Sequence, residues 1–192
     1  MHKLIFVAII GMLLYSPAMA FTDFNPHGVW YFDGHGFAER GFSRSRLNTW
    51  GRLFVQTRQQ DGSRYVTNYD VRVTLSAPGF NINMLTYQAS TTLREPMRVP
   101  RFAPTPSAPF RLPDFTRDGL TYSVKFTSAN AGTVRIRGTV GNVRVDSTNV
   151  MWREGTRRPK TYFADGCNVG GAGAMALPLV ALALALAFKR KT

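Results

Sequence analysis

Residues 64–75, with the sequence RYVTNYDVRVTL, decide the fold class of this chain. Residue types alternate along them: one face receives Tyr65, Thr67, Tyr69, Val71, Val73 and Leu75, and the other receives Val66, Asn68, Asp70, Arg72 and Thr74. Successive side chains of a β-strand point to opposite faces, so this period of two predicts a strand with one buried and one solvated face.

The same period recurs further along the chain. It runs through residues 119–127, 133–140 and 143–146, and Val150 and Trp152 continue it. Turn-forming pairs lie between these runs, at Asp61-Gly62, Asp118-Gly119, Ala131-Gly132 and Gly141-Asn142. We therefore expect residues 21–165 to form one all-β domain, a single antiparallel β-sandwich or barrel of about eight strands.

Residues 96–113 depart from the strand pattern. They contain six of the 11 prolines, and proline removes a backbone donor and favours extended structure. We expect a long connection across one end of the sheet, or a semi-rigid spacer between two halves. Four arginines lie along or beside it with few acids: Arg94, Arg98, Arg101 and Arg111.

The chain is strongly basic, with 24 Lys and Arg against 11 Asp and Glu. The alternation predicts a basic sheet face formed by Arg72, Lys125, Arg135, Arg137 and Arg144. Such a face favours anionic partners, here envelope glycan or lipid. A nucleic-acid platform is not expected, because Tyr65, Tyr69, Tyr122 and Phe126 fall on the apolar face.

Catalytic and metal-binding signatures are missing from the sequence. It has no Gly-x-Ser-x-Gly elbow, His-Glu-x-x-His pair, phosphate loop or dinucleotide fingerprint. His27, Asp33 and His35, with Asp23, form the one group of metal-ligand types, and we interpret them as turn and surface residues. We expect no metal, no cofactor and no enzymatic activity; a surface hydrolase is the least favoured alternative.

The aromatic stretch 28–37 contains Gly28-x-Trp30, a pattern faintly similar to the start of lipocalin-like barrels. That resemblance implies a small-ligand-binding barrel, which we keep as the alternative function. We expect Trp30 instead to plug the end of the sheet core.

The N-terminal 20 residues have the three parts of a secretory signal peptide. Lys3 supplies the positive region, residues 4–15 are apolar, and small residues precede a cleavage site after Ala20. We expect signal peptidase to release a mature chain that begins at Phe21 outside the cytoplasm.

An apolar segment, residues 172–188, lies near the C-terminus and precedes Lys189, Arg190 and Lys191. Seventeen helical residues span about 26 Å, close to the thickness of a bilayer core. The basic residues predict a transmembrane helix with a cytoplasmic C-terminus and with the β-domain outside.

The single cysteine precedes this helix. Gly166-Cys167-Asn168, the small residues 170–174, the apolar stretch 177–188 and the basic end resemble the Synergist-type C-terminal protein-sorting domains of bacteria, over residues 166–192. The resemblance implies cleavage by a rhomboid-like sorting protease near Cys167, Gly170 and Gly171, and transfer to a surface anchor. A permanent membrane anchor, or S-acylation of Cys167, is the simpler alternative. The sequence thus predicts an exported, surface-anchored, non-enzymatic binding or structural protein of the envelope.

Overall fold

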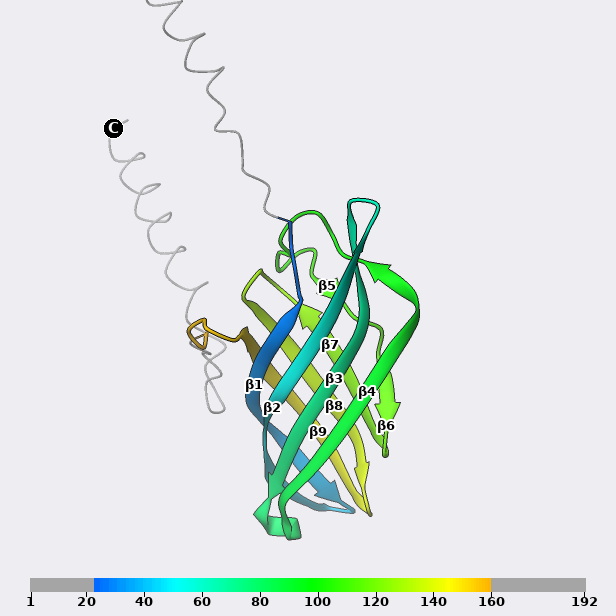
Figure 1. Cartoon of the computed structure of the whole chain (residues 1–192). Helices are drawn as coiled ribbons and strands as arrows, with labels where there is room; N and C mark the ends of the chain where they lie inside the picture. The colour runs from blue at the N-terminus through cyan, green and yellow to red at the C-terminus, as the bar shows by residue number, and fades with distance from the viewer. Residues whose placement is uncertain (1–22, 160–192) are drawn as a thin grey trace, which may run out of the picture. The chain divides into compact units, whose positions relative to one another are not determined.

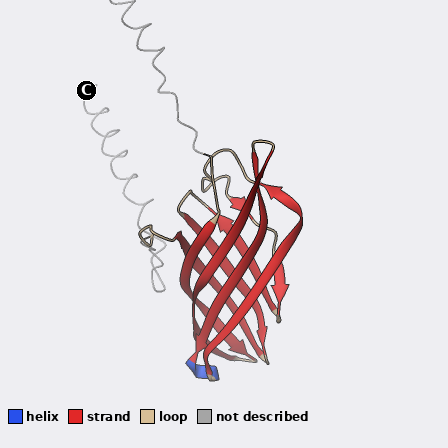
Figure 2. Cartoon of the chain, viewed as in Figure 1, coloured by secondary structure: helices blue, strands red, loops and turns tan. Residues whose placement is uncertain are grey.

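The computed structural model describes residues 23–159, without the side chain of Met84, and shows one antiparallel β-sheet (Figure 1). Its strands are β1 (Gly28–Arg40), β2 (Ser43–Gln60), β3 (Ser63–Ala77), β4 (Ile82–Arg98), β5 (Phe110–Arg111), β6 (Phe115–Arg117), β7 (Leu120–Phe126), β8 (Ala131–Val140) and β9 (Val143–Arg153). A short 3-10 helix, η1 (Pro78–Phe80), joins β3 to β4, and Figure 2 shows strand throughout the rest of the sheet. The predicted all-β antiparallel class is confirmed.

Two meanders make up the sheet, whose order is β4-β3-β2-β1-β9-β8-β7-β5, with β6 also paired to β7. The first and last strands join the two meanders, because β1 pairs with β9 from Trp30↔Arg153 to Glu39↔Arg144. β1 and β9 are far apart in the sequence and no short turn connects them, so the turn pattern of the sequence did not predict that they pair.

The sheet folds over so that its two meanders face each other across one core (Figure 1). Trp30 of β1 meets Phe126 of β7 edge-on at a ring distance of 4.9 Å, and Tyr69 of β3 meets Phe115 of β6 at 5.0 Å. Trp30 is fully buried and its indole N–H donates to the Pro26 carbonyl at 2.9 Å, which confirms that it plugs the core. In the described part of the chain, no ladder joins β4 to β5 or β6.

Alternation and turn chemistry explain most of the strands. Residues 69–75 and 120–126 bury the predicted apolar side chains, as expected for strands with one wet face. Asp61-Gly62 and Asp118-Gly119 both have positive φ, at 50° and 73° and at 52° and 77°. These are the values that two-residue hairpin turns require, so both turn predictions are confirmed.

The alternation predicted for residues 64–67 is wrong, because a β-bulge interrupts β3. Gln56 pairs with Asn68 but Thr57 pairs with Val66, so Thr67 is an extra residue without its own partner. The bulge reverses the faces of the residues before it. Val66 is consequently buried, whereas Tyr65 is only partly buried.

Two further sequence predictions need correction near the C-terminal strands. Ala131 and Gly132 lie inside β8, and residues 127–130 make the connection from β7. The inner face of β9 continues through Ser147, Asn149 and Met151 rather than through Val150 and Trp152. Buried polar residues interrupt the apolar pattern there, which hid the true period.

The proline-rich stretch forms the predicted connection, but it begins later, because β4 extends through Pro96 to Arg98. Residues 99–109 then cross the end of the sheet where the β2–β3 hairpin turns (Figure 1). The Val99 N–H donates to the Arg64 carbonyl at 3.0 Å, and the Tyr69 hydroxyl donates to the Pro113 carbonyl. These bonds fix both ends of the connection to β3.

The predicted signal peptide, residues 1–20, and the predicted sorting segment, residues 166–192, lie outside the described residues. Among residues 23–159, no helix has the length and apolar character needed to cross a membrane.

Candidate functional site

Four of the five predicted basic-face residues lie together on the outer side of β7, β8 and β9. Lys125, Arg135, Arg137 and Arg144 all point away from the core, because Val124, Val134, Ile136 and Val145 beside them are buried. We call this surface the β7–β9 face. Arg111 of β5 extends it, since Arg111 pairs in register with Lys125.

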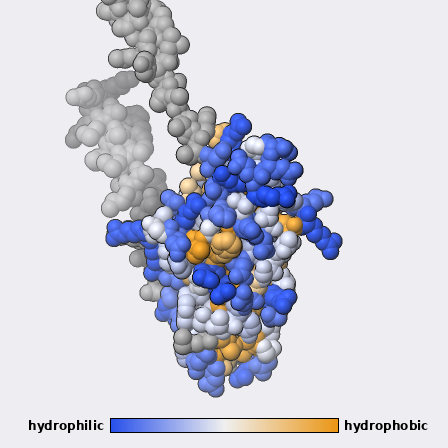
Figure 3. Space-filling model, in the orientation of Figure 1, coloured by the Kyte–Doolittle hydropathy of each residue, from blue (hydrophilic) through white to orange (hydrophobic). Residues whose placement is uncertain are grey.

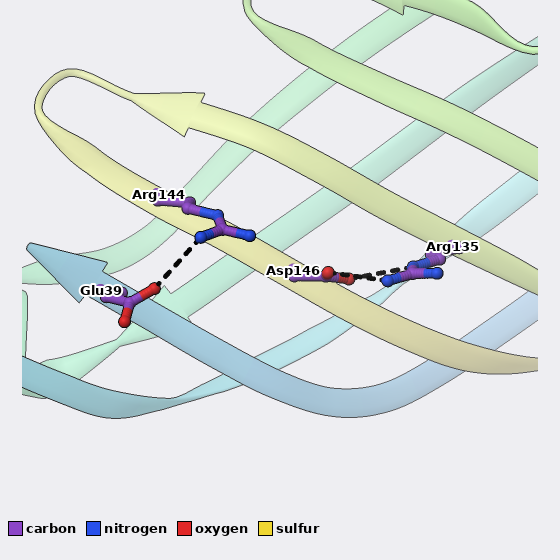
Figure 4. Close-up of polar contacts among 4 residues, drawn as sticks. All are labelled: Glu39, Arg135, Arg144 and Asp146. Carbon is purple, nitrogen blue, oxygen red and sulfur yellow. Dashed lines mark hydrogen bonds and ion pairs between the residues drawn. The ribbon is translucent and has the colours of Figure 1, made fainter.

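Carboxylates engage two cations of the β7–β9 face (Figure 4). Arg135 donates two hydrogen bonds to Asp146, from Nε at 3.1 Å and from Nη2 at 2.9 Å. These bonds raise the pKa of Arg135 above its ordinary value. Arg144 lies 3.6 Å from a carboxylate oxygen of Glu39. The net charge of this face is therefore lower than the sequence implied.

Lys125 and Arg137 remain unpaired on the same face. Within residues 23–159, no carboxylate lies within 4.0 Å of either cation. Asp146 lies opposite Arg137 in register, but its oxygens accept from Arg135 instead.

Arg72, the fifth predicted member, does not join the other four. It lies on β3, in the meander whose inner side faces β6 and β7, so the outer side of β3 points the opposite way. Its guanidinium lies 3.8 Å from Asp70. The sequence pattern identifies which residues are solvent-exposed, but it does not show which of them lie on the same side of the folded-over sheet.

A cleft of about 640 Å³ opens at the end of the sheet where the β2–β3 hairpin and the proline-rich connection meet. Its walls come from residues 23–24, Gln59 and residues 62–64 of the hairpin, the end of β4 with residues 99–101, and residues 108–111. The surface at this end is strongly hydrophilic (Figure 3). We call it the arginine cleft, because Arg64, Arg98, Arg101 and Arg111 line it.

The β3 bulge directs Arg64 toward the cleft. If Thr67 were paired regularly and no bulge were present, Arg64 would share the solvated face with Asp70 and Arg72. The bulge instead places it on the inner face with Val66, opposite Gln59 of β2. Arg64 is accordingly only partly exposed. Bulges commonly re-aim a side chain in this way near binding sites.

Positive charge predominates in the arginine cleft. Asp23 is the one carboxylate among its lining residues. In the described structure, no carboxylate lies within 4.0 Å of Arg64, Arg98 or Arg101. Arg111 lies 3.8 Å from Asp114, at the outer limit of an ion pair.

An aromatic cluster forms the floor of the arginine cleft. Phe24 and Phe110 are buried and each packs against Phe126, at ring distances of 5.5 and 5.8 Å. On the rim, Arg98 lies over the Tyr65 ring at 5.9 Å, and its Nη2 donates to the Tyr65 hydroxyl at 3.5 Å. A packed floor and a charged rim favour a polar ligand held near the opening.

Sequence reasoning identified only part of this cleft. It noted Arg98, Arg101 and Arg111 along the proline-rich stretch, but it did not single out Arg64. The bulge that directs Arg64 inward cannot be recognised in the sequence, because residues 64–67 are compatible with a regular strand. The one available signal was the placement of a basic residue two positions after the Asp61-Gly62 turn.

Exposed aromatic side chains mark the outer side of β1 and β2. Tyr31, Trp50 and Phe54 are each more than a third exposed, and Trp152 of β9 lies 6.4 Å from the Tyr31 ring. The Tyr31 hydroxyl donates to Glu154 at 2.9 Å, which raises the pKa of Tyr31. Exposed arginines, among them Arg46 and Arg52, lie on the same side of β2, and none of these aromatic residues lines the arginine cleft.

The residues of metal-ligand type do not converge. His27 Nδ1 accepts from the Thr57 N–H at 3.2 Å, His35 bonds Asn48 at 3.0 Å, and Asp33 accepts from Arg158 at 2.6 Å. Asp23 lines the arginine cleft. Across residues 23–159, no three His, Cys, Asp or Glu side chains group as metal ligands.

The predicted processing and topology residues, Ala20, Cys167, Gly170, Gly171, Lys189, Arg190 and Lys191, lie outside the described residues. No protein-family model matches the chain, and no curated protein sequence matches it either.

Proposed function

We propose that this chain is an exported, surface-anchored, non-enzymatic envelope protein whose β-domain binds an anionic envelope glycan or lipid through the β7–β9 face. The observation that carries the proposal is the pair Lys125 and Arg137, two cations on adjacent strands with no carboxylate within 4.0 Å among the described residues. A basic surface favours partners with repeated negative charge.

The shape of this face suits an extended partner. Neighbouring strands lie about 4.8 Å apart, so cations on β7, β8 and β9 form a ladder rather than a single point. Hydroxyl side chains lie between the cations: Thr121 lies opposite Arg137, and Thr133 opposite Lys125. Cations and hydroxyls together can bind the anionic groups and the hydroxyls of a polymer.

Delivery to the envelope is the second part of the proposal. Signal peptidase cleaves after Ala20, residues 172–188 insert in the membrane with a cytoplasmic C-terminus, and a rhomboid-like sorting protease cleaves near Cys167. The support is the order of residue types in residues 1–20 and 166–192. Intact-mass measurement of the surface form tests this part. A mass that includes Lys191-Thr192 would refute sorting and leave a permanent anchor.

The binding part is tested on heparin, a sulfated glycan, with the full-length protein in an uncharged detergent. The double variant Lys125→Glu/Arg137→Glu reverses both unpaired cations and leaves the Arg135–Asp146 pair intact. We expect elution at clearly lower salt, because screened electrostatic attraction decides retention. The matched control Arg46→Glu/Arg52→Glu makes the same charge change on the outer side of β2.

Retention that falls equally in both double variants would contradict the proposal, because net charge alone would then explain binding. Retention that depends on Lys125 and Arg137 but not on Arg46 and Arg52 supports a localised face.

A further inference from the structure

We propose that the arginine cleft is a second, separate binding site, and that it takes a phosphate group. This goes beyond the proposed function, because the cleft lies at the hairpin end of the sheet and uses different residues from the β7–β9 face, apart from their neighbour Arg111.

The first argument is charge. Arg64, Arg98 and Arg101 have no carboxylate within 4.0 Å in the described structure, and they line one cleft with Asp23 as the one acid. Arg98 is held against Tyr65, so Arg64 and Arg101 are the two guanidinium groups left for a ligand. Together they match a ligand that carries two negative charges better than a single carboxylate. A phosphate monoester has about this charge at neutral pH.

The second argument is donor geometry. A guanidinium presents five N–H donors in a planar fork, and it binds phosphate oxygens through paired hydrogen bonds. The basic residues that line the cleft are all arginine, with no lysine among them. Ser63 and Gln59 add a hydroxyl and an amide on the hairpin wall.

The third argument is that a β-bulge and the proline-rich connection together position the arginines of the cleft. The bulge at Thr67 turns Arg64 toward the inner side of the sheet, and the proline-rich connection brings Arg101 across from the end of β4. Bonds at both ends, from Val99 N–H to Arg64 and from Tyr69 to Pro113, hold that connection in place. The cations are thus positioned before a ligand arrives, which lowers the entropy that binding must overcome.

The size of the cleft limits the ligand. A volume of about 640 Å³ is within the range of small-molecule sites, and it holds a phosphate with a sugar or glycerol attached. A soluble sugar phosphate and a phospholipid head group both carry such a phosphate. In either case the arginines bind the phosphate itself.

Isothermal titration of the full-length protein, in an uncharged detergent, tests the site with inorganic phosphate, glucose 6-phosphate, glycerol 3-phosphate and acetate. We expect inorganic phosphate to bind more tightly than acetate. The double variant Arg64→Gln/Arg101→Gln should weaken phosphate binding by about tenfold or more, since hydrogen bonds between charged groups are lost. The matched control Arg46→Gln/Arg52→Gln should bind phosphate as the wild type does, and circular dichroism verifies that both variants fold.

A preference for glucose 6-phosphate over inorganic phosphate points to a sugar phosphate, and a preference for glycerol 3-phosphate points to a lipid head group. The site is refuted if phosphate does not bind, if acetate binds equally well, or if both double variants lose affinity equally. Heparin retention of Arg64→Gln/Arg101→Gln should stay near the wild-type value. Failure of this site therefore remains distinguishable from failure of the β7–β9 face.

Discussion

The β7–β9 face and the arginine cleft differ in how many of their arginines face a carboxylate: of Arg135, Arg137 and Arg144 on the face, only Arg137 has none within 4.0 Å among the described residues. On the face, Arg135 binds Asp146 through two hydrogen bonds, and Arg144 lies 3.6 Å from Glu39. In the cleft, Arg64, Arg98 and Arg101 line one space, and Asp23 is the one carboxylate among the described residues that line it.

This difference follows from how each region is built. In a sheet, the register brings direct and diagonal neighbours on adjacent strands within reach, so Asp146 of β9 can bind Arg135, its diagonal neighbour on β8. In the cleft, a hairpin end, a bulge and a proline-rich connection supply the arginines, and no ladder sets an acid against each one. Unmatched like charges cost stability, and proteins commonly retain such a cost at binding sites. Three changes test whether the two regions are independent.

The floor of the arginine cleft gives the largest effect. Phe110→Ala removes a buried ring that packs between Phe24 and Phe126, and we expect a loss of about 3 kcal/mol in the free energy of unfolding. Phosphate binding should fall sharply, because the wall that carries Arg111 loses its support. Heparin retention should change little. Urea denaturation measures the stability, with Phe42→Ala in the exposed β1–β2 turn as the control. Equal losses of phosphate and heparin binding would show that the two regions are not independent.

The second-largest effect is expected at alkaline pH, where two buried tyrosines of the core lower the stability of the fold. Burial raises the pKa of both Tyr69 and Tyr122 well above the ordinary value of 10.0, and Asp114 and Asp118 add to the respective shifts. Above pH 10 the unfolded chain loses these phenolic protons while the folded chain keeps them, so stability falls as pH rises. We expect a loss of about 1 kcal/mol for each tyrosine between pH 10 and pH 11.

Phenylalanine variants separate the two tyrosines. Tyr122→Phe should reduce the alkaline slope at no cost at pH 7, since the Tyr122 hydroxyl has no hydrogen-bond partner in the described structure. Tyr69→Phe should also reduce the slope, but it loses the bond to Pro113 and loosens the proline-rich connection. Urea denaturation at pH 9 to 11 gives the slopes. A slope that both variants leave unchanged would contradict this account.

The smallest effect is expected on the β7–β9 face. Asp146→Asn removes the carboxylate that engages Arg135, and it should cost roughly 0.5–1 kcal/mol of stability. The same change frees Arg135 for a ligand and adds one positive charge, so heparin elution should shift to higher salt while phosphate affinity stays constant. Asp118→Asn, at an exposed turn acid paired with Arg117, is the matched control. Elution that shifts equally in both variants would show that net charge, not Arg135, is responsible.

The sequence was most informative where strands are regular. Residues 69–75 and 120–126 follow the predicted alternation, and the predicted turns at Asp61-Gly62 and Asp118-Gly119 are present, with the positive φ that hairpin turns require. The sequence was least informative where a bulge or buried polar residues interrupt a strand. The bulge at Thr67 turned Val66 inward and Tyr65 outward, and the polar pair Ser147 and Asn149 hid the inner face of β9.

By itself, the sequence determined the antiparallel all-β class, the hairpin turns, and which cations of β7 to β9 face water, because alternation and turn chemistry are local properties of the chain. Only the tertiary structure decided that β1 pairs with β9, that Arg72 lies apart from Arg135, and that Arg64 meets Arg101 in one cleft. Those outcomes depend on how the sheet folds over and on where a bulge reverses its faces. Both are set by packing between residues far apart in the sequence, so no local sequence pattern predicts them.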